Sequence, residues 1–124
     1  MTDRLQLILR SAGEGICGVD LEMRAAFINP AAAALFGYRE EEVLGRNLHE
    51  LVHHTCQDGA PYPLEQCPLY AVLRDHKPRG GDDQTFWRKD GSPVAVAYTC
   101  SPMVEEGLVV GAVLVLRDIT EERR

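Results

Sequence analysis

The stretch DDQTFWRKDGSPVAVAYTCSPMVEEGLVVGAVLVLRDIT, residues 82–120, decides the fold. It holds three segments rich in strand-forming residues, at 82–89, 92–102 and 108–120. Asp90-Gly91 separates the first two segments, and this dipeptide suits the tight turn of a hairpin. Residues 105–107, Glu-Glu-Gly, make a second turn. The stretch therefore predicts three consecutive strands at the end of the chain.

The last of these segments, 108–120, is apolar at nearly every position instead of alternating between apolar and polar residues. One face of a sheet cannot use all of these side chains, so a strand of this kind is usually covered on both faces. We expect the core to cover one face. The first helix or a partner subunit is expected to cover the other.

The beginning of the chain predicts an amphipathic helix over residues 1–13, because apolar residues recur there at helical spacing. At 3.6 residues per turn this helix has only about two and a half turns within its apolar stretch. It is too short to hide the whole outer sheet face, and residual apolar patches usually mark interfaces. We therefore expect a symmetric homodimer through the first helices and outer sheet faces. The apolar stripe consists of Leu5, Ile8, Leu9 and Ala12.

A second helix is expected over residues 29–37. Asn29 is a capping residue, Pro30 fits the first helical position, and Gly37 suits a left-handed exit. Along the whole chain, the predicted order of elements is one helix, two strands, a cluster of short helices and three strands. This order predicts an α+β domain with one five-stranded antiparallel sheet and short helices on one face. The remaining elements are strands at 16–20 and 25–28 and helical segments at 39–45, 47–52 and 64–75, the last beginning at Leu64 or only at Pro68.

Length and composition limit the class of protein. The 124 residues fit one domain, with 45% apolar and 26% charged residues. A net charge of −6 argues against a nucleic-acid or anionic-membrane surface. No apolar run reaches the roughly 20 residues of a membrane helix, and the start lacks the features of a signal peptide. We expect a cytoplasmic protein whose four cysteines are thiols.

Several phrases, taken in order, resemble the PAS domain family of sensory modules. They cover residues 15–52, 86–102 and 107–124, which is nearly the whole chain. One departure is Arg39, because the family often has Ser or Thr at this place. Arginine cannot cap a helix in the same way, so we expect a weaker turn there. The most specific phrases are Asn29-Pro30 at a helix start, EEVLG at 41–45, the RKDG hairpin at 88–91 and the terminal Asp118-Ile119-Thr120.

The resemblance implies a single PAS domain, with an N-terminal helix at 1–13, a core at 14–120 and the start of a connector helix at 121–124. It also implies a function, because PAS domains sense a small molecule, redox state or light, or only dimerise. They pass the result to a linked effector. We expect a histidine kinase, with a diguanylate cyclase as the alternative. The domain itself is expected to be non-catalytic, since its sequence has no hydrolase or phosphate-loop motif.

The stretch HHTCQDGAPYPLEQCPLY, residues 53–70, concentrates candidate metal and redox residues. A metal site would use His54, Cys56, Asp58 and Cys67, with His53 as a further ligand, although their spacing lacks the two tight pairs of structural zinc. A redox site would pair Cys56 with Cys67. Cys67 would be the reactive thiol, because a helix N-terminus lowers a thiol pKa.

The same stretch admits a cofactor and a purely structural interpretation. Among haem-binding PAS domains a histidine is the axial ligand, and here His49, His53 and His54 are candidates. The Asn-Cys-Arg-Phe-Leu-Gln stretch of the flavin-binding branch is absent, so flavin is not expected. The favoured interpretation has no cofactor. In it, DGAPYP at 58–63 is turn chemistry and the loop is an ordered lid over the ligand side of the sheet.

Aromatic side chains are the candidates for contact with a small molecule. Strand alternation directs Phe86 inward and Trp87 outward, and it places Tyr98 and Cys100 on one face of the next strand. Tyr98 would present its hydroxyl to a ligand. The full predicted ligand set is Phe36, Tyr70, Phe86 and Tyr98.

The end of the last strand is the expected exit of the signal. In PAS domains an acid at this place often bonds to a basic residue or to backbone in the preceding hairpin. The resemblance therefore implies a pair between Asp118 and Lys89. This pair would fix where the connector helix leaves. The alternative is an ordinary helix cap by Asp118 or Thr120.

Overall fold

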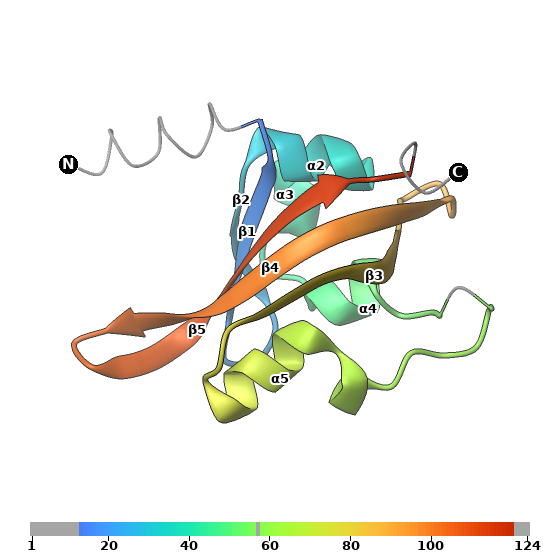
Figure 1. Ribbon diagram of the computed structural model, residues 1–124. Coiled ribbons are helices and arrows are strands. Elements are labelled where there is room, and N and C mark those ends of the chain that lie inside the picture. The colour runs from blue at the N-terminus through green and yellow to red at the C-terminus, as the bar shows by residue number, and fades with distance from the viewer. Residues whose placement is uncertain (1–12, 57, 121–124) are drawn as a thin grey trace.

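Five strands form one antiparallel sheet in the order β2-β1-β5-β4-β3 (Figure 1). We analysed a computed structural model, which describes residues 13–56 and 58–120. The predicted α+β fold is confirmed within these residues. The expected helix at 1–13 and connector at 121–124 lie outside them, apart from Gly13. The strands are β1 (Gly15–Asp20), β2 (Ala25–Ile28), β3 (Arg79–Trp87), β4 (Pro93–Glu105) and β5 (Leu108–Asp118).

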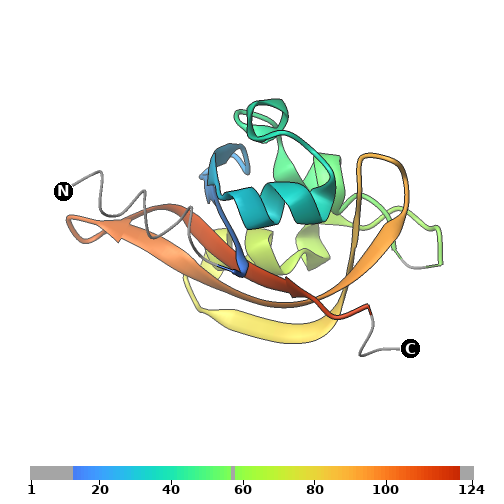
Figure 2. The ribbon, with the colours of Figure 1, turned by 90° about the horizontal axis from the view of Figure 1, so that it is seen from above.

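All helices described lie on one face of this curved sheet, as the view from above shows (Figure 2). The inner face of β5 contributes Ala112, Leu114 and Leu116, which are buried. Val113 and Val115 point to the opposite face and are half-buried. The core is therefore one layer of apolar side chains between helices and sheet. The helices are α2 (Pro30–Phe36), α3 (Glu40–Val43), α4 (Leu48–Val52), η1 (Leu64–Gln66) and α5 (Pro68–Asp75).

Local sequence signals explain several boundaries. Asn29 Oδ1 accepts a hydrogen bond from Ala32 N at 2.9 Å, and so caps α2. Gly37 ends that helix with φ of 77°, and Gly91 takes φ of 87° in the β3–β4 hairpin. Such left-handed conformations favour glycine because it lacks Cβ.

Asn29 also joins elements that are distant in sequence. Its Oδ1 accepts a second hydrogen bond from Ile16 N at 2.9 Å. Its Nδ2 donates to the Glu14 carbonyl oxygen, also at 2.9 Å. The side chain is 1% exposed. One capping residue thus fastens the start of α2 to the start of β1.

The turn at α3 forms without a side-chain cap from Arg39, as expected for that residue. Glu42 compensates, because its Oε1 accepts a hydrogen bond from Arg39 N at 2.8 Å. Lys89 Nζ donates to the other Glu42 oxygen. These contacts, the Arg39 amide first, hold the pKa of the Glu42 carboxyl at about 2.

The loop between α4 and α5 is closed by its own backbone. Tyr62 N donates to the His54 carbonyl oxygen at 2.8 Å, and Thr55 pairs with Pro61 as an isolated bridge. Trp87 Nε1 donates to the Thr55 carbonyl oxygen at 2.7 Å, which ties the loop to β3. The helical segment predicted at 64–75 is divided, so that α5 begins at Pro68, where the missing N–H costs nothing.

Candidate functional site

A cavity of about 20 Å³ lies between the inner face of the sheet and helices α4 and α5. This volume accommodates one water-sized occupant. Pockets for organic ligands usually measure about 300–1,000 Å³. A porphyrin, a flavin or a typical metabolite therefore does not fit the cavity. Its walls are Met23, Leu48, His49, His53, Cys67, Pro68, Leu69, Gln84, Phe86, Tyr98 and Leu114.

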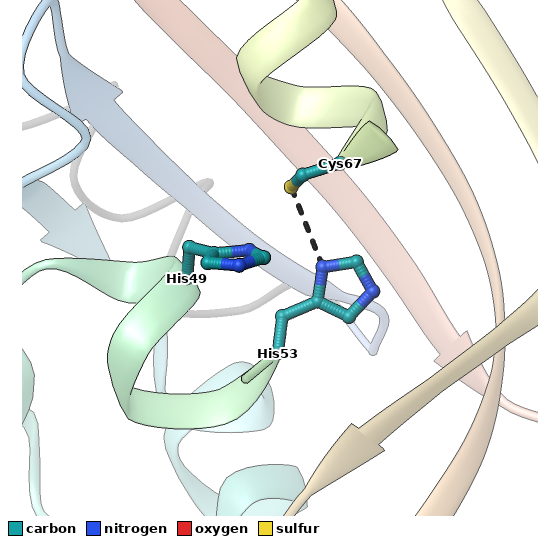
Figure 3. A group of neighbouring side chains, drawn as sticks. All are labelled: His49, His53 and Cys67. Atoms are coloured by element: carbon teal, nitrogen blue, oxygen red, sulfur yellow. Dashed lines mark hydrogen bonds between the residues drawn. The ribbon is translucent and has the colours of Figure 1, made fainter. Parts of the chain in front are cut away.

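Three side chains in this wall form a cluster of potential metal ligands. His49 lies on α4 and His53 follows its last residue, and the spacing of four places both rings on one side of the helix. Cys67 stands at the start of α5. Figure 3 shows the three side chains turned towards one another. One donor atom from each lies within 4.8 Å of the others, and all three residues are buried.

The two imidazoles are oriented by oxygen acceptors. His49 Nε2 lies 3.1 Å from the Tyr62 carbonyl oxygen, and His53 Nε2 lies 2.8 Å from Gln84 Oε1. Because both oxygens only accept, each Nε2 carries the proton and donates. Tyr62 Oη donates to the same Gln84 oxygen at 3.0 Å, which is consistent with that amide orientation. Each histidine is therefore held with its lone pair on Nδ1.

The ring of His53 is packed between aromatic side chains. Its centroid lies 4.1 Å from that of Tyr62 and 4.6 Å from that of Phe86. Phe86 in turn stacks on Phe36 at 5.8 Å. These contacts restrict rotation of the imidazole and shield it from bulk solvent. The position of His53 is thus determined by β3 and the loop as well as by its own helix.

Burial keeps the cluster uncharged at neutral pH. Loss of solvation lowers the pKa of His53 to about 4, and it also lowers the pKa of His49. For Cys67 the same effect raises the thiol pKa. The backbone amides of Leu69 and Tyr70 act in the other direction but are outweighed. The helix start was expected to lower the pKa of the Cys67 thiol, but the pKa is raised because desolvation dominates.

The predicted metal set is not brought together among the described residues. Cys67 is buried, whereas three other members have local partners in the loop. His54 Nδ1 lies 2.6 Å from Thr55 Oγ1, Cys56 Sγ lies 3.8 Å from the Pro61 carbonyl oxygen, and Asp58 Oδ1 accepts from Ala60 N at 3.0 Å. All four cysteines of the chain are free. The turn places these three side chains outside, and His49 takes their place beside His53 and Cys67.

The predicted ligand set is divided by the structure. Phe86 and Tyr98 line the cavity. Phe36 is fully buried behind Phe86, and Tyr70 is half-buried with the Arg74 guanidinium 5.8 Å from its ring centroid. Neither is part of the cavity wall. Desolvation raises the pKa of Tyr98 to about 12, so its hydroxyl keeps its proton. Ligand contact by these residues stays a prediction.

Sequence reasoning missed Gln84 and Tyr62, and it assigned His49 only to a haem. The spacing of four between His49 and His53 on a helix was a usable signal for a shared face. Gln84 and Tyr62 had no such signal. They reach the histidines from β3 and from the loop, through contacts that span 31 and 13 residues.

The exit of the last strand is held by Arg88 instead of Lys89. Arg88 Nη2 lies 3.5 Å from Asp118 Oδ2, and Arg88 Nε donates to the Leu35 carbonyl oxygen at 3.3 Å. Lys89 turns to Glu42. The predicted pair was wrong by one residue, because Lys89 lies in the hairpin turn and its backbone N–H donates to the Phe36 carbonyl oxygen, which places its side chain near α3. Asp118 Oδ1 accepts from Thr120 N at 2.8 Å, as a cap does.

The sheet order and the helices on one face define an α+β fold, and comparison with known families identifies its class. The family model for the PAS fold matches residues 3–119. The chain belongs to the PAS family, whose members are sensory domains of signalling proteins. Within the part of the chain that the structure describes, no helix has the length and apolar character needed to span a membrane.

Curated relatives and solved structures agree with this family. The chain is 32% identical over 123 residues to the probable diguanylate cyclase DgcE of Escherichia coli K12, covering 98% of the chain and 11% of that protein. It is 30% identical over 122 residues to the sensor histidine kinase DcuS of the same strain, covering 98% of the chain and 20% of DcuS. The chain thus spans about a tenth to a fifth of these relatives.

A PAS domain from Colwellia psychrerythraea superimposes on the structure with a TM-score of 0.77. Its sequence identity is 20%, and the match covers 97% of this chain and 98% of that one. At this identity the comparison supports the fold alone. The likeness over the full length of both chains agrees with the five-stranded sheet described above.

Proposed function

We propose that the chain is the input module of a cytoplasmic signalling protein, and that it acts as a dimer on a covalently linked effector. A histidine kinase is the favoured effector, with a diguanylate cyclase as the alternative. The supporting observation is the family match over residues 3–119, together with relatives of both effector types. Four free thiols agree with a reducing compartment.

The dimer is proposed to form through the outer face of the sheet, together with the helix expected at 1–13. On that face the apolar residues Val113 and Val115 of β5 lie beside Ile16 of β1. All three are half-buried on the side of the sheet that the described helices leave uncovered (Figure 2). An apolar face of this kind is typical of an interface.

Sedimentation of the purified chain over a concentration series tests the dimer. We expect Val113→Asp/Val115→Asp to be monomeric and folded at concentrations where the unmodified chain is dimeric. Leu44→Asp is the matched control, because Leu44 is an apolar residue that is 46% exposed and lies at the end of α3. An unmodified chain that is monomeric at high concentration would end the proposal.

Coupling to a kinase has a separate test. The chain replaces the segment of DcuS that it matches, and autophosphorylation of the hybrid is measured. We expect an active hybrid whose activity is lost with the double aspartate variant and kept with Leu44→Asp. Activity that survives the double variant would show that the outer face does not carry the coupling.

A second candidate is a dimerisation module that binds no organic ligand. The cavity of about 20 Å³ favours it, since side chains of the domain itself fill the space that a metabolite would need. Native mass spectrometry and an absorption spectrum of freshly purified protein test this candidate. A stoichiometric organic mass, or a haem or flavin spectrum, would reject it.

A further inference from the structure

The cluster of His49, His53 and Cys67 remains to be explained once the fold and dimer are accounted for. A buried polar side chain normally has all its hydrogen-bonding atoms paired. Among the described residues, His49 Nδ1 is a buried atom with no hydrogen-bond partner. Leaving such an atom unpaired costs about 1–3 kcal/mol. The orphaned lone pair of His49 therefore indicates a partner that is not part of the polypeptide.

The neighbouring side chain presents the same arrangement. His53 donates through Nε2 to Gln84, and its Nδ1 lies 3.3 Å from Cys67 Sγ. Histidines that bind metal ions usually donate their other N–H to an oxygen acceptor, which fixes the ring and raises the basicity of the ligating nitrogen. Both His49 and His53 have such an acceptor. The two imidazoles are thus already held as metal ligands are.

We propose that His49, His53 and Cys67 bind one thiophilic transition-metal ion of the Zn²⁺ type. Two imidazoles and one thiolate suit zinc, and they do not suit Mg²⁺ or Ca²⁺, which take oxygen ligands. Binding joins Zn²⁺ to the Cys67 sulfur and releases the thiol proton to solvent. Both histidines bind the ion as neutral imidazoles. A water molecule in the adjoining cavity, which accommodates one, completes the four-coordinate site.

The geometry needs only a small adjustment. Zinc–ligand distances of about 2.0–2.3 Å place tetrahedral ligands roughly 3.5 Å apart. The His53 Nδ1 to Cys67 Sγ distance of 3.3 Å is already of this size. The widest donor separation in the cluster is 4.8 Å at most. A shift of about 1 Å in the donor atoms closes the site.

Charge near the site is compatible with a cation. Zinc with one thiolate carries one net positive charge, and a buried charge requires compensation. Desolvation lowers the pKa of His49, but the carboxylates of Glu50 and Glu65 act in the opposite direction and favour a positive charge there. A redox function that pairs Cys67 with Cys56 is less well supported, because Cys56 Sγ bonds to the Pro61 carbonyl oxygen within the loop.

A role of the metal ion as the signal rests on the proposed sensory function. The ion would join α4 to α5, and His53 would transmit the change to β3 through Gln84. Binding of the ion does not depend on the proposed dimer. The two can therefore fail separately.

Titration of the chelator-treated chain with Co²⁺, followed by displacement with Zn²⁺, tests the site. We expect one Co²⁺ per chain, with intense visible bands and a near-ultraviolet sulfur-to-cobalt band. Cys67→Ser should abolish the sulfur band and weaken binding at least about 100-fold, and His49→Gln should weaken it by a similar factor. The matched controls are His54→Gln and Cys56→Ser, which change exposed or half-buried residues of the same loop and should bind like the unmodified chain.

Two results would overturn the proposal. One is an unmodified chain that does not bind Co²⁺ or Zn²⁺ stoichiometrically. The other is binding that survives Cys67→Ser and His49→Gln, or that is lost in His54→Gln. Circular dichroism of each variant verifies the fold, and His49→Gln decides the matter if Cys67→Ser does not fold. Sedimentation of the same samples without metal shows whether the dimer persists when metal binding fails.

Discussion

Asn29 should contribute far more stability than a helix cap alone. Asn29→Ala removes the capping bond to Ala32, worth about 1 kcal/mol, and two bonds that hold α2 to β1. Each of those two contributes about 1 kcal/mol, because the backbone groups at Ile16 and Glu14 lose a partner. The expected loss is about 3 kcal/mol in the free energy of unfolding. For a domain of this size that corresponds to roughly 12 °C in melting temperature.

Asn47→Ala is the matched control for this prediction. Asn47 also caps a helix, because its Oδ1 accepts from Glu50 N at 3.0 Å. The two asparagines share this capping role, whereas the bonds to a neighbouring strand belong to Asn29. The expected cost of Asn47→Ala is about 1 kcal/mol. Urea unfolding followed by Trp87 fluorescence, at one protein concentration and with chelator present, measures both variants. Equal losses for the two asparagines would refute the reasoning, since the strand contacts would then contribute nothing.

Two further predictions concern the core and the exit. Burial raises the pKa of Cys17 to about 12 from 9.0, so above pH 9 the unfolded chain binds fewer protons than the folded one and stability falls as pH rises. From pH 8 to pH 10 this thiol should cost about 1 kcal/mol, and urea unfolding of Cys17→Ala should lack that part of the decline. Arg88→Ala should lose about 1–2 kcal/mol, because Arg88 bonds to Leu35, Pro93 and Asp118, whereas Lys89→Ala should change stability by less than about 0.5 kcal/mol. The same unfolding assay measures the Arg88→Ala and Lys89→Ala variants. A larger loss of stability for Lys89→Ala would contradict the finding that Arg88, and not Lys89, pairs with Asp118.

Much of the fold could be predicted because its signals are local. Asn29, Pro30 and Gly37 define α2 within nine residues, and Asp90-Gly91 defines a hairpin within two. The alternation of β5 was harder to predict, because both faces are apolar. Its register shows that Leu114 and Leu116 face the core. These signals depend on backbone conformations that a few neighbouring residues impose. The elements can therefore be predicted without knowledge of the rest of the chain.

For the candidate site, the sequence predicted the segment and the types of residue but not the set of residues that lie together. Sequence alone indicated that the region around His53 and Cys67 held chemically capable residues, but it selected His54 and Cys56 as their companions. The choice of His49 depended on how α4 packs against α5 and β3. Gln84 reaches His53 across 31 positions, and no periodicity relates the two.

The sequence by itself determined the strands, the capped helices and the family, because each of these follows from interactions over a few residues or from phrases in a fixed order. The tertiary structure decided which histidine lies beside Cys67, whether Arg88 or Lys89 reaches Asp118, and how little space the core leaves. Those outcomes depend on side-chain direction and on packing between distant elements. A shift of one residue along a helix or strand turns a side chain to another face and so changes its contacts, while the local sequence pattern stays the same.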